Sequence, residues 1–92
     1  MKNSIIQVEE ECFFTGRTTN LERHHVFFGT ANRKNSDKYG LWVWLSVDMH
    51  RGKHGVHHNK EFDLILKEHG QKAFEELCGH DEFMRVFGRN YL

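Results

Sequence analysis

Two neighbouring histidines inside an apolar, β-prone run place the strongest constraint on how this chain folds. The run reads LERHHVFFG, residues 21–29, with His24 and His25 at its centre. Consecutive side chains of a β-strand point to opposite faces, so only one of these imidazoles can face the core. The sequence therefore predicts two different environments, and two different roles, for adjacent copies of the same side chain.

A second group of histidines follows further along the chain. Eight of the 92 residues are histidine, and four of them lie close together: His50, His54, His57 and His58. Imidazole is the commonest metal ligand in proteins, and its unperturbed pKa is the closest of any side chain to neutrality. A pair in one strand and a cluster after a second strand together favour a metal site over isolated structural histidines.

Composition narrows the class of protein. A chain of 92 residues predicts one domain, residues 1–92, with a modest core. Thirteen basic and thirteen acidic side chains cancel, which argues against nucleic-acid binding by bulk positive charge and leaves local contacts. Cys12 and Cys78 are too few for a disulfide framework, so we expect a reducing, cytoplasmic location. No apolar run approaches the roughly 20 residues that span a bilayer, so we expect no membrane partner.

The apolar pattern of the first half predicts two strands and a loop. Gly16 and Asn20 are turn residues, so we expect short N-terminal strands at residues 12–14 and 21–28. The polar segment 30–38 is expected to be a loop, because it contains no apolar periodicity.

Residues 39–47, YGLWVWLSV, form the clearest expected strand, because apolar residues alternate with two tryptophans there. Helical spacing follows, with Asn59 as the expected N-cap and Gly70 as the expected stop. The sequence therefore predicts an α+β fold whose ββα core covers residues 12–69, followed by a helical C-terminal third with helices over 71–88.

This order of elements suggests how the histidines meet. Folding of a ββα unit would bring His24 beside His50 and beside one of two further residues, His54 or His57. Their nitrogens would bind a divalent cation. His25 would face the other way and would stay free to take a proton from water. A base and a cation are the two parts that hydrolysis of a phosphodiester requires.

Three polar side chains are candidate contacts to phosphate or DNA. Arg33 and Lys34 lie in the polar segment, and Asn59 follows the histidine cluster. Such contacts position a nucleic acid without reading its sequence. The competing interpretation is that Arg33 and Lys34 are solvated charges of a surface loop.

Several stretches resemble the small HNH-type nucleases of phages and prophages, also called His-Me finger or ββα-metal proteins. The most specific are HHVFFG, NRKNSDKYGL, GVHHN and FGRNYL, and the similarity extends over nearly the whole chain. The resemblance implies a metal-dependent DNA endonuclease, encoded by a phage and acting in the cytoplasm of a bacterial host.

The same resemblance assigns the site residues. It implies that His24, His50 and His57 bind the metal and that His25 is the general base. His54 is the alternative third ligand, because two late histidines four positions apart are the pattern of colicin-type HNH nucleases. The implied cofactor is one divalent ion: Mg, Mn, Ni or Zn. The central asparagine of the HNH name has three candidates here: Asn32, Asn35 and Asn59.

This chain departs from the family at a second, structural metal site. Many members carry two CxxC pairs that hold zinc, whereas the corresponding positions here are Cys12, Thr15, Ser46 and Met49. A single thiolate cannot replace four zinc ligands, so we expect no intact structural zinc knuckle. The missing knuckle and the neutral net charge support an alternative function, a catalytically weak or inactive HNH-like domain that binds protein or DNA. The sequence also leaves a homodimer open.

Overall fold

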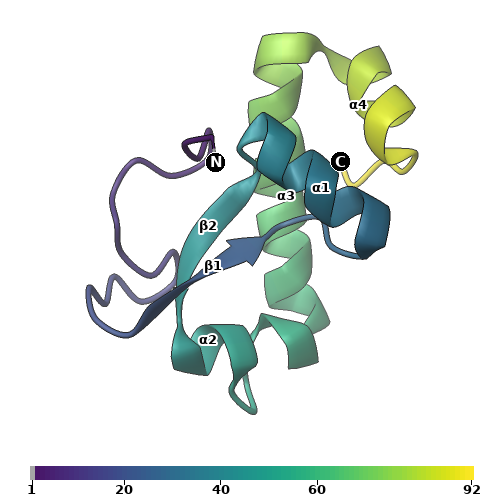
Figure 1. The fold of residues 1–92 in the computed structure, drawn as a ribbon. Helices are drawn as coiled ribbons and strands as arrows, with labels where there is room; N and C mark the ends of the chain where they lie inside the picture. The colour runs from purple at the N-terminus through teal and green to yellow at the C-terminus, as the bar shows by residue number, and fades with distance from the viewer. Residues whose placement is uncertain (1) are drawn as a thin grey trace.

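A computed structural model describes residues 2–92 and confirms an α+β architecture built on a two-stranded antiparallel sheet. In chain order the elements are β1 (Leu21–His25), α1 (Thr30–Tyr39), β2 (Trp42–Ser46), α2 (Val47–Arg51), the 3₁₀ turn η1 (Val56–His58), α3 (Lys60–Cys78) and α4 (His80–Phe87). The long helix α3 runs behind the sheet, with α2 near one of its ends and α4 packed at the other (Figure 1). Among residues 2–92, none of the helices combines the length and the apolar character that a membrane-spanning segment requires.

The register of the sheet separates the two strand histidines. His24 lies opposite Val43, and His25 lies opposite Trp42. Residues directly opposite each other in an antiparallel pair share a face, and Val43 is fully buried in the core together with Leu41 and Leu45. His24 is therefore on the core face and His25 on the other, as the alternation of side chains predicts.

The prediction of an N-terminal strand at residues 12–14 is wrong, because this segment forms a turn. The Cys12 amide donates to the Arg17 carbonyl at 2.8 Å, and the Gly16 amide donates to the Cys12 carbonyl at 2.8 Å. Gly16 adopts a φ of 74°, which an L-residue rarely does, so the chain closes on itself there instead of extending. The strand that follows is also shorter than expected and ends at His25.

The loop expected at residues 30–38 is also wrong, since helix α1 occupies this segment. The helix lacks an apolar stripe and is anchored instead through Ser36, which is fully buried. The Ser36 hydroxyl donates to the Phe27 carbonyl at 2.7 Å and accepts from the Phe27 amide at 3.2 Å. Gly40 ends the helix in the left-handed region. A helix therefore joins the two strands, although no periodic pattern of apolar residues predicts it.

Helix α3 begins as predicted but does not stop at Gly70. The Asn59 side chain caps it by accepting from the amides of Glu61 and Phe62, at 3.0 and 3.2 Å. The helix then continues through Gly70 to Cys78. A Cβ at Gly70 would lie 3.0 Å from the Phe27 ring and 3.2 Å from Val26. This glycine therefore allows close approach of the helix to the chain after β1, and it is not a terminator.

Leucine in place of Gly70 should destabilise the protein by about 1–3 kcal/mol, because overpacking forces buried neighbours to shift. Val26 and Phe27 are both buried and cannot move into solvent. Urea unfolding measures the change, with Lys72→Leu at an exposed position of the same helix as the control. Surface changes of that kind are usually within about 0.5 kcal/mol. Equal unfolding free energies for the two variants would contradict this packing role.

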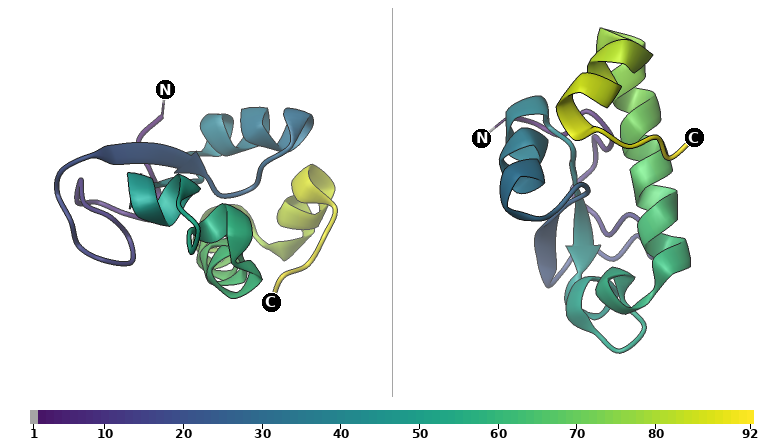
Figure 2. Two further views of the ribbon diagram at one scale, coloured as in Figure 1. Left: turned by 90° about the horizontal axis from the view of Figure 1, so that it is seen from below. Right: turned by 90° about the vertical axis from the view of Figure 1, so that its right-hand side faces the viewer.

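The aromatic C-terminal third packs onto the core, as its apolar stripes predict. The rings of Phe74 and Phe83 are buried, with centroids 5.6 Å apart. Beyond α4, residues 88–92 cross α3 (Figure 2). The buried Gln71 holds them there, because its amide donates to Asn90 Oδ1 at 2.7 Å and accepts from the Tyr91 amide at 2.7 Å.

Candidate metal centre

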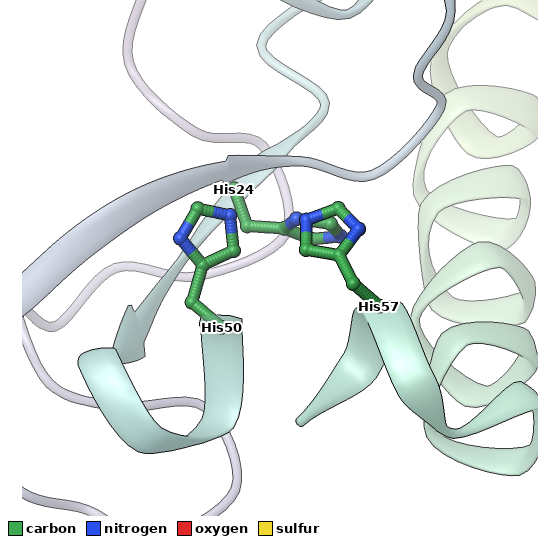
Figure 3. A group of neighbouring side chains, drawn as sticks. All are labelled: His24, His50 and His57. Carbon is green, nitrogen blue, oxygen red and sulfur yellow. The ribbon is translucent and has the colours of Figure 1, made fainter. Parts of the chain in front are cut away.

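Three imidazoles from three different elements converge at one end of the sheet (Figure 3). His24 comes from β1, His50 from α2 and His57 from η1. Their ring centroids form a nearly equilateral triangle, with separations of 5.2, 5.2 and 5.1 Å. One nitrogen of each ring lies within 4.8 Å of the others, so these three residues could bind a metal ion.

The chemistry of His24 fits a metal ligand. Its side chain is only 1% exposed, and its Nε2 atom is buried without a hydrogen-bond partner. Burial, together with the neighbouring His50 and His57, lowers the pKa of His24 to about 3. The ring is therefore neutral at pH 7, with a lone pair available. An orphaned buried nitrogen is costly in a folded protein, and a bound cation would satisfy it.

A carboxylate orients the second imidazole. His50 Nδ1 lies 2.8 Å from Glu22 Oε1, and Glu22 also accepts from Arg51 at 2.8 Å. The hydrogen bond from His50 lowers the pKa of Glu22, so this group is an ionised acceptor and His50 Nδ1 must carry the proton. The other nitrogen of His50 is thereby the one left to bind a metal. Pairs of this kind fix the tautomer of metal-bound histidines.

Two glycines bring the third imidazole into place. A Cβ at Gly52 would lie 2.4 Å from the Asp48 carbonyl oxygen, and a Cβ at Gly55 would lie 2.7 Å from that of Met49. Only glycine permits this tight return of the chain from α2 to η1, which carries His57 back beside His50. His57 is an exposed residue, and the partial desolvation of its ring and the neighbouring His50 lower its pKa.

The other candidates of the histidine cluster lie outside this triangle. His54 is exposed in the loop between α2 and η1, and His58 is exposed at the end of η1. Of the two alternatives that the sequence left open for the third ligand, the geometry brings His57 to the other imidazoles and leaves His54 outside their group, although both residues are exposed.

His25 projects from the opposite face of β1 and reaches the edge of the same pocket. Its Nε2 lies 2.7 Å from Asp37 Oδ1, a carboxylate of α1. His25 also lines a pocket of about 250 Å³ together with the three converging histidines, Arg23, Phe28 and Arg33. A histidine held by a carboxylate at the edge of such a pocket can accept a proton from a bound molecule.

Of the three residues that the sequence offers as phosphate contacts, one lies at the histidine pocket and two do not. Arg33 lines the pocket, whereas Lys34 is an exposed residue of α1 that does not line it. The Asn59 side-chain oxygen is occupied in capping α3. Arg23 also lines the pocket and was not predicted from the sequence. Its guanidinium carbon lies 4.5 and 5.2 Å from the Trp42 and Trp44 ring centroids. The sequence did contain a signal for this contact. Arg23, Trp42 and Trp44 are at strand positions whose side chains point to the face of the sheet opposite the core.

Three of the four positions at which the sequence resemblance would place zinc-knuckle ligands also come together: Cys12, Ser46 and Met49. The Cys12 thiol is buried and donates to the Ser46 hydroxyl at 3.7 Å. Ser46 in turn accepts from the Met49 amide at 3.3 Å and so caps α2. Hydrogen bonds therefore connect these positions, and β2 leads directly into the helix that carries His50.

Comparison with protein-family models, with curated protein sequences and with solved structures found no match to this chain.

Glu22→Gln should weaken divalent-metal affinity by about 10–100-fold, the usual effect of removing a residue that orients a ligand. Glutamine keeps the size of the side chain but loses the charge that fixes the His50 tautomer. Isothermal titration with Zn²⁺ and Ni²⁺ measures the change. Glu61→Gln, at an exposed position of α3, is the matched control. Unchanged affinity in Glu22→Gln would show that His50 needs no orienting carboxylate.

Proposed function

We propose that this protein is a metal-dependent endonuclease that hydrolyses DNA, with an HNH-like ββα-metal centre. One observation carries the proposal: the buried, unpartnered His24 nitrogen shares a pocket with two further metal-competent imidazoles and with a carboxylate-held histidine. Metal ligands and a positioned base are the two requirements of hydrolytic phosphodiester cleavage.

The side chains of the pocket divide the work of such a reaction. His24, His50 and His57 would hold the divalent ion, which when bound stabilises the charge that develops on the phosphate and on the leaving oxygen. His25 takes the proton of the attacking water. Asp37 orients the His25 ring and stabilises the cation that forms on it.

Two arginines supply positive charge beside this centre. Arg23 and Arg33 both line the pocket and can pair with the non-bridging oxygens of a phosphate. The stacking of Arg23 on two tryptophans restricts its guanidinium before substrate binds. Local charge of this kind fits a chain whose net charge is zero.

The ligand set favours particular metals. Three imidazole nitrogens suit Zn²⁺ and Ni²⁺ better than Mg²⁺, which prefers oxygen ligands and keeps several waters. Among the four ions that the family resemblance implies, we therefore propose that zinc and nickel bind most tightly.

A plasmid-nicking assay tests this function. The purified protein is incubated with supercoiled plasmid in EDTA or in Mg²⁺, Mn²⁺, Ni²⁺ or Zn²⁺, beside His24→Ala and the matched His54→Ala variant. Metal-dependent nicking that is lost in His24→Ala and kept in His54→Ala supports the proposal. Absence of nicking with every ion would overturn it and would favour a binding domain without catalytic activity.

A further inference from the structure

We propose that a groove beside the metal centre binds an unpaired nucleotide next to the scissile phosphate, so that the substrate is single-stranded or locally melted DNA. This inference rests on the proposed nuclease function and assigns it a substrate class. The groove has a volume of about 530 Å³ and lies between α1, α3 and the C-terminal residues. The residues that line it include Phe28, Lys60, Lys67, Arg89 and Tyr91.

The groove is continuous with the metal centre through one exposed ring. Phe28 lines both the groove and the histidine pocket, and its centroid lies 5.6 Å from that of His57 and 6.0 Å from that of His24. A further hollow of about 340 Å³, lined among others by Phe28, His57 and Lys60, adjoins the same side. A strand whose phosphate lies at the histidines can therefore pass over Phe28 into the groove.

The charges of the groove suit a nucleic-acid backbone. Lys60 and Arg89 are exposed cations at its rim. Lys67 is nearly buried, and its Nζ lies 2.5 Å from Asp63 Oδ2 and 4.0 Å from the Phe28 ring centroid. The charge of Lys67 is therefore paired within the wall, where it also supports one face of the Phe28 ring. If one phosphate of the strand lies at the histidines, these two exposed cations can bind the next phosphate, on the other side of the nucleotide in the groove.

The aromatic rings of the groove suit a base. Phe28 is 44% exposed although it is a large apolar side chain next to the candidate catalytic pocket. Tyr91 also lines the groove, with the Arg89 guanidinium carbon 5.2 Å from its ring centroid. Stacking on such rings is the usual way in which proteins bind bases without reading sequence. The volume exceeds the lower bound of about 300 Å³ for small-ligand pockets, which a nucleotide fills.

This arrangement selects unpaired DNA. A base in a duplex is stacked on both sides and can enter a pocket only after it leaves the helix, at a cost of a few kcal/mol. A base of a single strand is already free to stack on Phe28 and Tyr91. Because the groove begins at the histidine pocket, this preference acts on the nucleotide adjacent to the phosphate that is cut.

Fluorescence anisotropy in EDTA tests the groove without requiring metal or cleavage. The probes are a fluorescein-labelled dT12 strand and a duplex of the same length. Lys60→Ala with Arg89→Ala is compared with the matched double variant Lys72→Ala with Arg17→Ala, which removes the same charge from exposed positions elsewhere. Phe28→Leu tests stacking, because leucine keeps the apolar bulk without the ring.

The wild-type protein should bind dT12 at least about tenfold more tightly than duplex. Phe28→Leu should lose about 5–150-fold in dT12 affinity, the range of one stacked base. The groove double variant should also lose dT12 affinity because it removes two phosphate contacts, while the control pair changes far less. Equal losses in the groove and control pairs, or wild-type binding of duplex as tightly as dT12, would overturn the inference.

The outcomes separate this inference from the proposed function. Single-strand binding through the groove without metal-dependent nicking would refute the nuclease and leave the groove standing. Nicking that is unaffected by the groove variants, with no preference for dT12, would refute the groove and leave the nuclease standing. Circular dichroism of each variant identifies any loss of fold before binding is interpreted.

Discussion

Replacing His24 with leucine is expected to abolish metal binding and at the same time to stabilise the metal-free protein. The imidazole is almost fully buried, with its Nε2 unpartnered, and leucine has a similar volume. Removing an unsatisfied buried polar group is worth about 1–3 kcal/mol. A residue that lowers the stability of the metal-free protein is expected where the site is arranged for a ligand.

The pH dependence of stability should change in the same variant. The pKa of His24 is lowered from 6.5 to about 3 in the folded protein. Between these values the unfolded chain binds a proton that the folded chain excludes. Stability that is present above pH 6.5 is therefore lost as the pH falls toward 3, and His24→Leu should show a flatter profile.

Urea unfolding in EDTA at pH 7 and pH 4.5 measures both effects. Saturating Zn²⁺ at pH 7 should stabilise the wild-type protein by about 2.7 kcal/mol at 100 times the dissociation constant, and His24→Leu not at all. His54→Leu, at an exposed position, serves as the control. A His24→Leu protein that is less stable without metal, or that is still stabilised by zinc, would contradict the assignment of this imidazole.

His25→Ala is expected to lower the rate of DNA cleavage by about 10²–10⁴-fold without changing metal affinity, as removal of a general base does. The reason is the register of β1, which places His25 on the face away from the three converging imidazoles and against Asp37. Nicking kinetics and zinc titration on the same preparation separate the two effects.

Asp37→Asn provides the graded comparison. Asparagine can still accept a hydrogen bond from His25 but cannot stabilise a positive ring, so its rate should lie between those of the wild type and His25→Ala. Asp48→Asn, at an exposed carboxylate of α2, is the control. Loss of metal from His25→Ala would show that the roles of the two strand histidines are reversed.

Local rules of the backbone explain what could be predicted from the sequence. Alternation along a strand separated His24 from His25, and the same alternation placed Leu41, Val43 and Leu45 on the core face. Capping chemistry located the start of α3 at Asn59. Each of these features depends on a residue and its immediate neighbours.

Features that depend on distant contacts could not be predicted in this way. Helix α1 is held by a buried serine hydroxyl bonded to Phe27, and such a pair leaves no periodic pattern. Gly70 reads as a helix stop until the packed side chain of Phe27 is known. Glu22 and Asp37, which bond to His50 and His25, are ordinary acidic residues in the sequence, and only folding brings them to these partners.

The buried amide of Gln71 has a consequence for the local dynamics of the segment that follows α4. Because that buried group bonds to Asn90 and Tyr91, these two residues are held against α3 and should open only when the helix itself opens. The Tyr91 amide should therefore show slow hydrogen exchange, because its acceptor is a fully buried side chain.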